Sequence, residues 1–414
     1  MPVTAVRRPA HALRDMVRYW RAERVTLRQG FTALTISSAG DLLAGLALGA
    51  MTGQLQRIPG LLLLIPAAIG MRGNIFGAVG SRLGTSIHAG LFRVTREKSG
   101  VLYQNAYASM MLSIVTSMYL AVGARIMTAA LGLPSSSVWD FVVISVLGGV
   151  FSSVVVLALT IVLARFSYAR NWDMDSVSGP VVTFIGDTIT LPALFLASLL
   201  AQRHYVTLVM AWVIAVFALV CLVMAFLTKL PVARRIIRES LFVLALTGAV
   251  NLLAGAVLEH RIHRLLALPA LLVLLPSFLE DAGALGAIVS SRLASKLHLG
   301  AIRPRLIPER LAILDITLAA PFALSVFTLV GVSAHVVSRG LGIATPGLLK
   351  MVEVSLIAGY LATLGAAIIA YAGAVATFRF GLDPDNHAIP IVTSSLDLLG
   401  VVTLVGTVVL LGVK

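Results

Sequence analysis

The sequence has little charge and almost no cysteine. Of its 414 residues only 12% are charged, whereas soluble domains carry roughly a quarter. A single cysteine, Cys221, excludes an internal disulfide and a metal site built from cysteine ligands. We interpret Cys221 as a small apolar residue inside a helix. The low charge excludes a soluble enzyme and a disordered chain.

What the sequence has instead is long apolar runs. Apolar residues make up 58% of the chain and the mean hydropathy is +0.97. Runs such as 42–51 and 212–227 are continuous, whereas porin strands alternate apolar and polar residues. Stretches near 20 apolar residues predict membrane-spanning helices. We expect eleven, at about 31–51, 57–84, 103–131, 138–164, 178–200, 205–229, 241–258, 266–294, 311–336, 348–376 and 388–412.

The net charge of +14 is explained by topology. With the N-terminus in the cytoplasm, the inside segments hold 23 of the 32 basic residues and the outside segments hold six. This is the positive-inside pattern, and it predicts a multi-pass cell-membrane protein with its C-terminus outside. The first 30 residues carry seven arginines and no apolar core. They predict a cytoplasmic arm along anionic membrane lipid rather than a signal peptide or a nucleic-acid-binding tail.

The two halves of the chain resemble each other at a constant offset of 210 residues. Ser81-Arg82-Leu83 recurs as Ser291-Arg292-Leu293, and the pattern Pro-x-Val-Thr-x-x-x-Asp that ends at Asp187 recurs at Asp397. A fixed offset of this kind indicates a duplication. We therefore divide the chain into a basic tail (1–30), a first repeat (31–200), a linker span (201–235) and a second repeat (236–414).

An odd number of spans in each repeat decides the architecture. A second five-span unit joined directly would enter the membrane inverted, and the unpaired sixth span restores its direction. We expect an all-α polytopic membrane protein of eleven transmembrane helices, built as two parallel five-helix repeats joined by a linker helix. The chain is then a pseudo-dimer, acting as a monomer or weak oligomer, with its ion path on the axis between the repeats.

The strongest candidates for an ion site are Asp187 and Asp397. Each lies seven residues after the proline near the start of its span, roughly 10 Å along the helix at 1.5 Å per residue. That depth is close to the middle of a ~30 Å hydrocarbon core, where ionisable residues are costly. Two carboxylates facing one axis suit a divalent cation, and oxygen neighbours such as Thr183 and Thr393 favour a hard ion such as Mg²⁺.

An alternative for these aspartates is a salt bridge to a buried arginine, such as Arg72 or Arg125. A weaker candidate pair is Asp41 and its counterpart Asn251, near the middle of the first span of each repeat. Both can offer oxygen to a cation or make a helix-packing hydrogen bond.

The halves also differ at the broken second span of each repeat. Glycines interrupt residues 70–80. Either they break the helix and expose carbonyl groups to an ion path, or they permit close packing of helices through small residues. In the second half Glu280 and Asp281 stand where the first half has Gly70 and Met71. The halves are therefore not functionally identical, and these acids could suit a second ion.

These motifs resemble a known family. Residues 66–74 match the Pro-x-x-x-Gly-x-x-Gly-Asn signature of MgtE-type Mg²⁺ transporters, and are more similar still to the duplicated solute carrier family 41 form. Residues 173–191 and 386–400 resemble that family's segment that leads through proline to the ion-site aspartate. The resemblance implies a Mg²⁺ path on the two-fold axis, with the ion-site aspartate at Asp187 and Asp397.

This sequence departs from the family pattern in three places. The Gly-Asn of the second span is present as Gly73-Asn74 but is Gly283-Ala284 in the second half. The acidic stretch is complete at 383–386 and altered at 173–176. We expect its acids, Asp173, Asp175, Asp383 and Asp385, at the cytoplasmic mouth of the path, where they could attract cations or cap helices. About 30 residues precede the first span in this sequence, from which we expect no counterpart of the large Mg²⁺-sensing domains of the family.

We therefore expect a divalent cation transporter, with Mg²⁺ as the transported ion. A channel and a Na⁺-coupled exchanger both remain open. An aspartyl intramembrane protease would need Tyr-Asp and Gly-x-Gly-Asp motifs, which are missing, and a structural or sensor protein is the third class. The candidate metal ligands are Asp187, Asp397, Thr183, Thr393, Asp41, Asn251, Asn74 and Asp281.

Overall fold

The structure is a computed structural model that describes residues 9–95, 97–170, 174–201, 204–305, 307–380 and 389–413. Its regular elements within those ranges are all α-helices. Eleven candidate spans in the described chain are long and apolar enough to cross a membrane, which confirms the predicted number.

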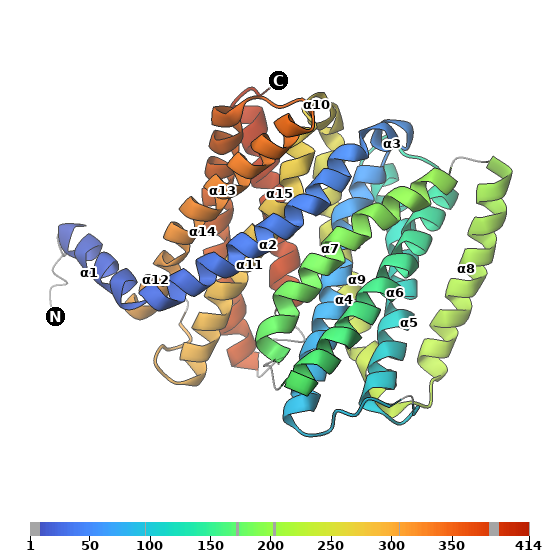
Figure 1. Ribbon diagram of the computed structural model, residues 1–414, viewed down its shortest axis with the longest axis horizontal. Coiled ribbons are helices and arrows are strands. Elements are labelled where there is room, and N and C mark those ends of the chain that lie inside the picture. The colour runs from blue at the N-terminus through green and yellow to red at the C-terminus, as the bar shows by residue number, and fades with distance from the viewer. Residues whose placement is uncertain are drawn as a thin grey trace.

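Two sets of helices follow each other along the chain (Figure 1). The short helix α1 (Pro9–Ala22) leads into the first set: α2 (Arg24–Ala50), α3 (Thr52–Arg57), α4 (Leu61–His88), α5 (Val101–Ala130), α6 (Val138–Arg170) and α7 (Met174–Leu200). After α8 (His204–Leu227) comes the second set: α9 (Pro231–His260), α10 (Ile262–Ala267), α11 (Ala270–His298), α12 (Arg310–Thr317), α13 (Ala319–Gly340), α14 (Leu348–Phe380) and α15 (Ile389–Leu410).

The 210-residue offset persists in the backbone. Gly90 and Gly300 both have positive φ (69° and 68°), as do Gly132 and Gly342 (64° and 71°). Each pair follows corresponding helices, where a left-handed residue ends the helix and glycine adopts it without strain. The helices α4 and α11 start at the same end of the bundle, beside α3 and α10 (Figure 1), so the repeats run parallel as predicted.

The first helix of each repeat packs against the other repeat. A Cβ added at Gly45 in α2 would lie 1.9 Å from the carbonyl oxygen of Val273 in α11. The equivalent contact joins Gly255 in α9 to the carbonyl oxygen of Leu63 in α4, at 2.1 Å. Small residues permit this close approach of helix backbones in membranes. The repeats are therefore interlocked at their centre.

One helix differs between the repeats. The helix α5 is continuous, whereas its counterpart is divided into α12 and α13 at Leu318. Pro321 follows three residues later and cannot donate a backbone hydrogen bond to Thr317, which favours a break at this position. The Leu318 amide instead donates to the Asp315 carbonyl oxygen at 3.1 Å.

The predicted linker helix α8 lies at the edge of the bundle (Figure 1). Only 28% of its apolar window is buried, and large side chains such as Val213 and Leu219 are exposed. Such a surface fits contact with lipid, as expected of a helix that only joins the repeats. Cys221 is a buried residue of this helix, as predicted.

Candidate ion site

Acidic side chains from both repeats gather at the centre of the molecule. Asp187 in α7 interacts electrostatically with Glu280 in α11, Asp41 in α2 and Asp397 in α15. Glu280 also interacts with Asp397 and with Asp41. Asp41 and Asp187 are only 0% and 2% exposed. The structure thus brings Asp187 and Asp397 into one carboxylate cluster, whose charges come from four helices.

The cluster consists of two pseudo-equivalent triplets. One triplet is Gly70, Asn251 and Asp397: a Cβ added at Gly70 would lie 2.1 Å from Asn251 Nδ2 and 3.5 Å from Asp397 Oδ2. The equivalent positions in the other half are Glu280, Asp41 and Asp187. Each triplet combines the second and first helices of opposite repeats with the last helix, because the first helices are exchanged. The second triplet carries three carboxyl groups and the first carries one.

Serine hydroxyls support two of the acids. The Ser37 hydroxyl donates to Asp41 Oδ2 at 3.3 Å, and the Ser38 hydroxyl donates to Asp281 Oδ2 at 2.7 Å. Asp281 is fully buried. The Ser277 hydroxyl donates to the Ser38 carbonyl oxygen at 3.3 Å. This hydrogen bonding ties Asp281 to α2, so Asp281 holds helices together while Glu280 is directed at the aspartates.

The other predicted ligands occupy different surroundings. Asn74 in α4 donates from Nδ2 to the Thr247 hydroxyl in α9 at 3.4 Å. The Thr393 hydroxyl donates to the Pro390 carbonyl oxygen at 3.1 Å, within its own helix. Thr183 is partly buried in α7. Asn74 therefore links the two repeats, as Ser38 does on the other side.

The second helices α4 and α11 are continuous, so the predicted break at their glycines is wrong. Open space nevertheless lies beside some of these glycines. A Cβ added at Gly73 or Gly77 in α4, or at Gly283 in α11, would meet no atom within 4 Å. Gly73 and Gly283 are equivalent at the 210-residue offset. The three residues lie on the same helix faces as Gly70 and Glu280, at spacings of three and seven. The space beside these faces is therefore next to the carboxylate cluster.

Several polar atoms of the cluster have no hydrogen-bond partner. They are Asp41 Oδ1, Asp187 Oδ1, Asp281 Oδ1 and both side-chain polar atoms of Asn251. Buried polar groups are normally hydrogen-bonded, and each exception needs an explanation. In the described part of the chain, no three His, Cys, Asp or Glu side chains come close enough to hold a metal ion directly.

The structure does not support the alternative in which Asp187 and Asp397 form salt bridges with Arg72 or Arg125. Arg72 is 1% exposed, and it donates to the Ser117 hydroxyl at 2.8 Å and to the Ser152 hydroxyl at 3.3 Å. Arg125 donates to the Ser135 hydroxyl at 3.1 Å. Within the described ranges no ion pair joins either arginine to the aspartates of the cluster.

Glu280 is the residue that the sequence-based list of ligands omits. Its counterpart Gly70 has no side chain. Glu280 lies on the same face of α11 as Gly283. The face shared with Gly283 was the signal that could have identified it, because residues three apart lie on one side of a helix. The adjacent Asp281 is rotated by about 100° at 3.6 residues per turn, and it contacts Ser38 instead.

The acidic pairs at 173–175 and 383–385 cannot be placed. Residues 173, 383 and 385 and the side chain of Asp175 lie outside the described residues. Their predicted position at the mouth of the path stays a prediction.

Comparison with known proteins gives the family. The family model for MgtE, a divalent cation transporter, matches residues 65–197 and 275–407. The two segments start 210 residues apart and end 210 residues apart, which is the offset of the repeat. Together they cover more than half of the chain.

Curated relatives agree with this match. The chain is 26% identical over 405 residues to solute carrier family 41 member 3 of Rattus norvegicus, covering 89% of this chain and 83% of the relative. It is 26% identical over 369 residues to solute carrier family 41 member 2 of Mus musculus, with 82% and 62% covered. It is 24% identical over 263 residues to the Homo sapiens member 2, with 60% and 44% covered. No solved structure matches the chain.

The matched segments contain most of the second to fifth spans of each repeat, with the glycines of α4 and α11 and the acids Asp187, Glu280, Asp281 and Asp397. The relatives are transporters rather than enzymes, which agrees with the prediction that this chain is not an enzyme. The chain is an all-α, multi-pass membrane protein that belongs to the MgtE family of divalent cation transporters.

Proposed function

We propose that this protein transports Mg²⁺ along the axis between its two repeats, and that Asp187 and Asp397 form the central ion site. The single observation that carries the proposal is the cluster of carboxylates contributed by both repeats, with Asp187 interacting electrostatically with Asp41, Glu280 and Asp397. An acidic group inside a membrane bundle is costly without a compensating charge. A passing cation supplies that charge.

The donor set supports a hard cation. The groups nearest the proposed path offer oxygen: carboxylates at Asp41, Asp187, Glu280 and Asp397, and the amide of Asn251. Oxygen ligands suit Mg²⁺ and Ca²⁺ rather than softer metals, which prefer sulfur or imidazole. The unpartnered oxygens at Asp41 and Asp187 are free to accept hydrogen bonds.

We propose that the ion keeps most of its water. Mg²⁺ dehydrates reluctantly and holds octahedral oxygen ligands at about 2.1 Å. Carboxylates that accept hydrogen bonds from the bound water would lie roughly 4–5 Å from the metal. A hydrated ion does not need three direct protein ligands. The size of the hydrated ion would then distinguish Mg²⁺ from other ions.

The proposed orientation places the N-terminus in the cytoplasm. It rests on the distribution of basic residues, with 23 in the segments of one side and six in those of the other. Arg57, Arg261 and Arg264 lie near α3 and α10, which would face outside in this arrangement.

The test is Mg²⁺ flux into proteoliposomes containing the purified protein. Asp187→Asn and Asp397→Asn each keep the side-chain shape but remove one charge, and each should reduce flux at least about tenfold, the effect of 1.4 kcal/mol. The double variant should abolish flux. The two single variants should differ because the triplet of Asp187 contains Glu280, whereas the triplet of Asp397 contains Gly70 at the equivalent position.

Matched controls are Asp140→Asn, a half-buried acid at the start of α6 that accepts a hydrogen bond from the Ser137 hydroxyl, and vesicles without protein. Normal Mg²⁺ flux in the double variant would overturn the site. Flux of another divalent ion without Mg²⁺ flux would overturn the substrate. Repeating the assay with and without a Na⁺ gradient separates a Na⁺-coupled exchanger, which needs the gradient, from a channel.

A further inference from the structure

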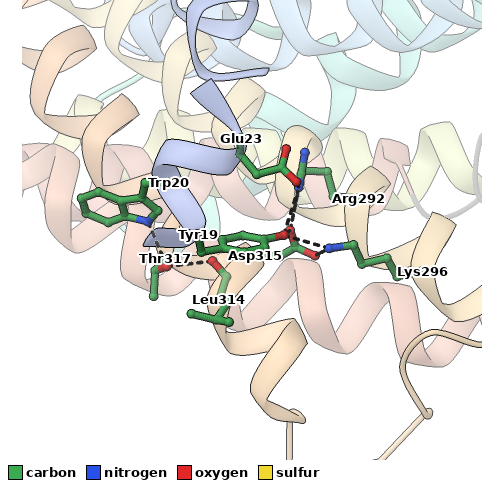
Figure 2. Close-up of polar contacts among 8 residues, drawn as sticks. All are labelled: Tyr19, Trp20, Glu23, Arg292, Lys296, Leu314, Asp315 and Thr317. Atoms are coloured by element: carbon green, nitrogen blue, oxygen red, sulfur yellow. Dashed lines mark hydrogen bonds and ion pairs between the residues drawn. The ribbon is translucent and has the colours of Figure 1, made fainter. Parts of the chain in front are cut away.

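The helix α1 is attached to the second repeat by a group of charged and polar side chains (Figure 2). The Tyr19 hydroxyl donates to Asp315 Oδ1 at 2.6 Å, and Trp20 Nε1 donates to the Thr317 hydroxyl at 3.2 Å. Glu23 forms an ion pair with Arg292 at 3.2 Å. One face of α1 is thus joined to both α11 and α12.

Asp315 is the centre of this group. It is 1% exposed, and it accepts from Arg292 Nη2 at 2.8 Å and forms an ion pair with Lys296. Lys296 also donates to the Tyr19 hydroxyl at 3.0 Å. Burial and the hydrogen bond to Asp315 raise the pKa of Tyr19, so its phenol remains a donor at neutral pH. A further ion pair joins Arg310 to Asp15 of α1.

The first repeat has no such arrangement at the equivalent positions. Arg82, the counterpart of Arg292, donates from Nε to Asn105 Oδ1 at 2.9 Å. Asn105 stands where the second repeat has Asp315, and Ser86 stands where it has Lys296. The first repeat therefore has a single hydrogen bond from an arginine to a neutral amide where the second repeat has an ion cluster that binds α1.

The opposite face of α1 carries arginines. Arg14, Arg18 and Arg21 are exposed, and their spacing of four and three residues places them on one side of a helix. Val17 is 37% exposed beside them. Tyr19, Trp20 and Glu23 lie on the other side. The docked helix thus presents a row of positive charge away from the protein.

We propose that α1 is a strap whose arginine face binds anionic lipid headgroups while its other face holds the second repeat through Asp315. Each basic residue near an anionic surface contributes about 1 kcal/mol of attraction. Three arginines would therefore favour the docked helix about 100-fold, at 1.4 kcal/mol for each factor of ten. The two faces are opposite each other, so lipid binding and docking reinforce each other.

The strap opposes transport. In the described conformation Asp41, Asp187 and Asp281 are at most 2% exposed, so water does not reach the cluster freely. The docked strap fixes the ends of α11 and α12 in this state, and α11 carries Glu280. Releasing α1 would allow these helices to move and the path to open. This part of the inference rests on the proposed transport of Mg²⁺.

Docking can be measured without transport. Spin labels at Ala22→Cys and Leu299→Cys, in a chain carrying Cys221→Ala, report the distance between α1 and the end of α11. Both positions are exposed. In nanodiscs with anionic lipid we expect one narrow distance distribution, and in purely zwitterionic lipid a broad one. Arg14→Gln, Arg18→Gln and Arg21→Gln together should broaden it in both lipids.

A charge-matched control distinguishes this from a general loss of positive charge. Arg93, Arg234 and Arg238 are exposed arginines away from α1, and replacing all three with Gln should leave the narrow distribution in anionic lipid unchanged. Asp315→Asn gives the second repeat the residue that the first repeat already has, so it should fold. It should undock α1 in either lipid.

Flux completes the test. Asp315→Asn should raise Mg²⁺ flux in anionic vesicles at least about threefold and remove its dependence on anionic lipid, because part of the docking equilibrium is lost. A narrow distance that persists in zwitterionic lipid or in the α1 arginine variant would overturn lipid as the partner. Unchanged distance and flux in Asp315→Asn would overturn the strap. Absence of wild-type flux with lipid-dependent docking would overturn the proposed function and the strap's effect on it, but would support the lipid-bound helix.

Discussion

The two repeats have the same helices but different charges. Residues 70–72 of the first repeat are Gly-Met-Arg, and the equivalent residues 280–282 are Glu-Asp-Ala. Glycines at the close helix contacts and turns recur in both halves, because the packing of backbones requires them. The polar residues have diverged. The duplication thus preserves the architecture, while the acids at the site come mainly from one triplet.

Comparing the repeats separates the features that both share from the features that only one has. Interlocking through Gly45 and Gly255 is symmetric, so it belongs to the shared architecture. The acid at Glu280 and the docking of α1 at Asp315 occur on the second repeat and have no counterpart at the equivalent positions Gly70 and Asn105 of the first. Selectivity and regulation are therefore expected to respond unequally to changes in the two repeats, and stability is expected to respond equally.

The largest effect should come from the interlocking glycines. Gly45→Val and Gly255→Val would place side chains against the carbonyl oxygens of Val273 and Leu63. Overpacking usually costs about 1–3 kcal/mol, and here a backbone would have to move, so we expect loss of folded protein. Thermal unfolding and size exclusion in detergent measure this. Gly406→Ala is the control, since its Cβ would meet no atom within 4 Å. If only one of the two Val variants unfolded, the two close contacts would not contribute equally to stability.

The next effect compares two adjacent acids of the second repeat. Glu280→Gln should lower Mg²⁺ flux about tenfold, the effect of 1.4 kcal/mol, because Glu280 interacts with Asp187 and Asp397. Asp281→Asn should lower it only about twofold to threefold, because Asp281 is hydrogen-bonded to Ser38 and its acidic neighbours are Asp41 and Glu280 rather than the two ion-site aspartates. Initial rates in proteoliposomes decide the order. A larger loss for Asp281→Asn would place the path on the other side of α11.

A moderate effect on stability should appear in the first repeat alone. Ser117→Ala removes an acceptor of the buried Arg72, and an unsatisfied buried donor costs about 1–3 kcal/mol. In the Arg72→Met background the same change should cost less, since no guanidinium remains to be satisfied. A double-mutant cycle of unfolding free energies measures the coupling. Equal costs in both backgrounds would show that Ser117 acts independently of Arg72.

The smallest effect concerns the acids predicted at the mouth of the path. Neutralising Asp173, Asp175, Asp383 and Asp385 together should slow Mg²⁺ uptake about twofold at low salt, through loss of local field. At high ionic strength the difference should vanish, because salt screens exposed charges over a few ångströms. Uptake that does not change at low salt would leave these residues with a role in helix capping only.

The number of spans and the parallel arrangement of the repeats could be predicted because hydropathy and the repeat offset are properties of the sequence itself. The orientation in the membrane, inferred from the basic residues, stays a prediction. The exchange of α2 and α9 between repeats could not, since an apolar helix does not indicate which neighbour it contacts. The backbone contacts at Gly45 and Gly255 decide that arrangement.

The site was predictable only in part. Asp187 and Asp397 were identified from the repeat, and the structure brings both into one cluster, although their role as ligands stays a prediction. Glu280 was not separated from Asp281, because one residue of helical rotation decides which acid faces the cluster and only packing sets that rotation. The hydrogen-bond partners of Arg72 could not be predicted from the sequence either, since Ser117 and Ser152 belong to other helices.

The central claim is that Asp187 and Asp397 face the same ion. Its most direct test uses hexaamminecobalt(III), an inert ion of the size of hydrated Mg²⁺, and measures how strongly it stabilises the folded wild-type protein, each single Asn variant and the double variant. We predict that Asp187→Asn and Asp397→Asn each weaken its binding at least about tenfold, the effect of 1.4 kcal/mol, and that the double variant does not bind it. Binding at wild-type strength in either single variant would contradict a shared site on the axis.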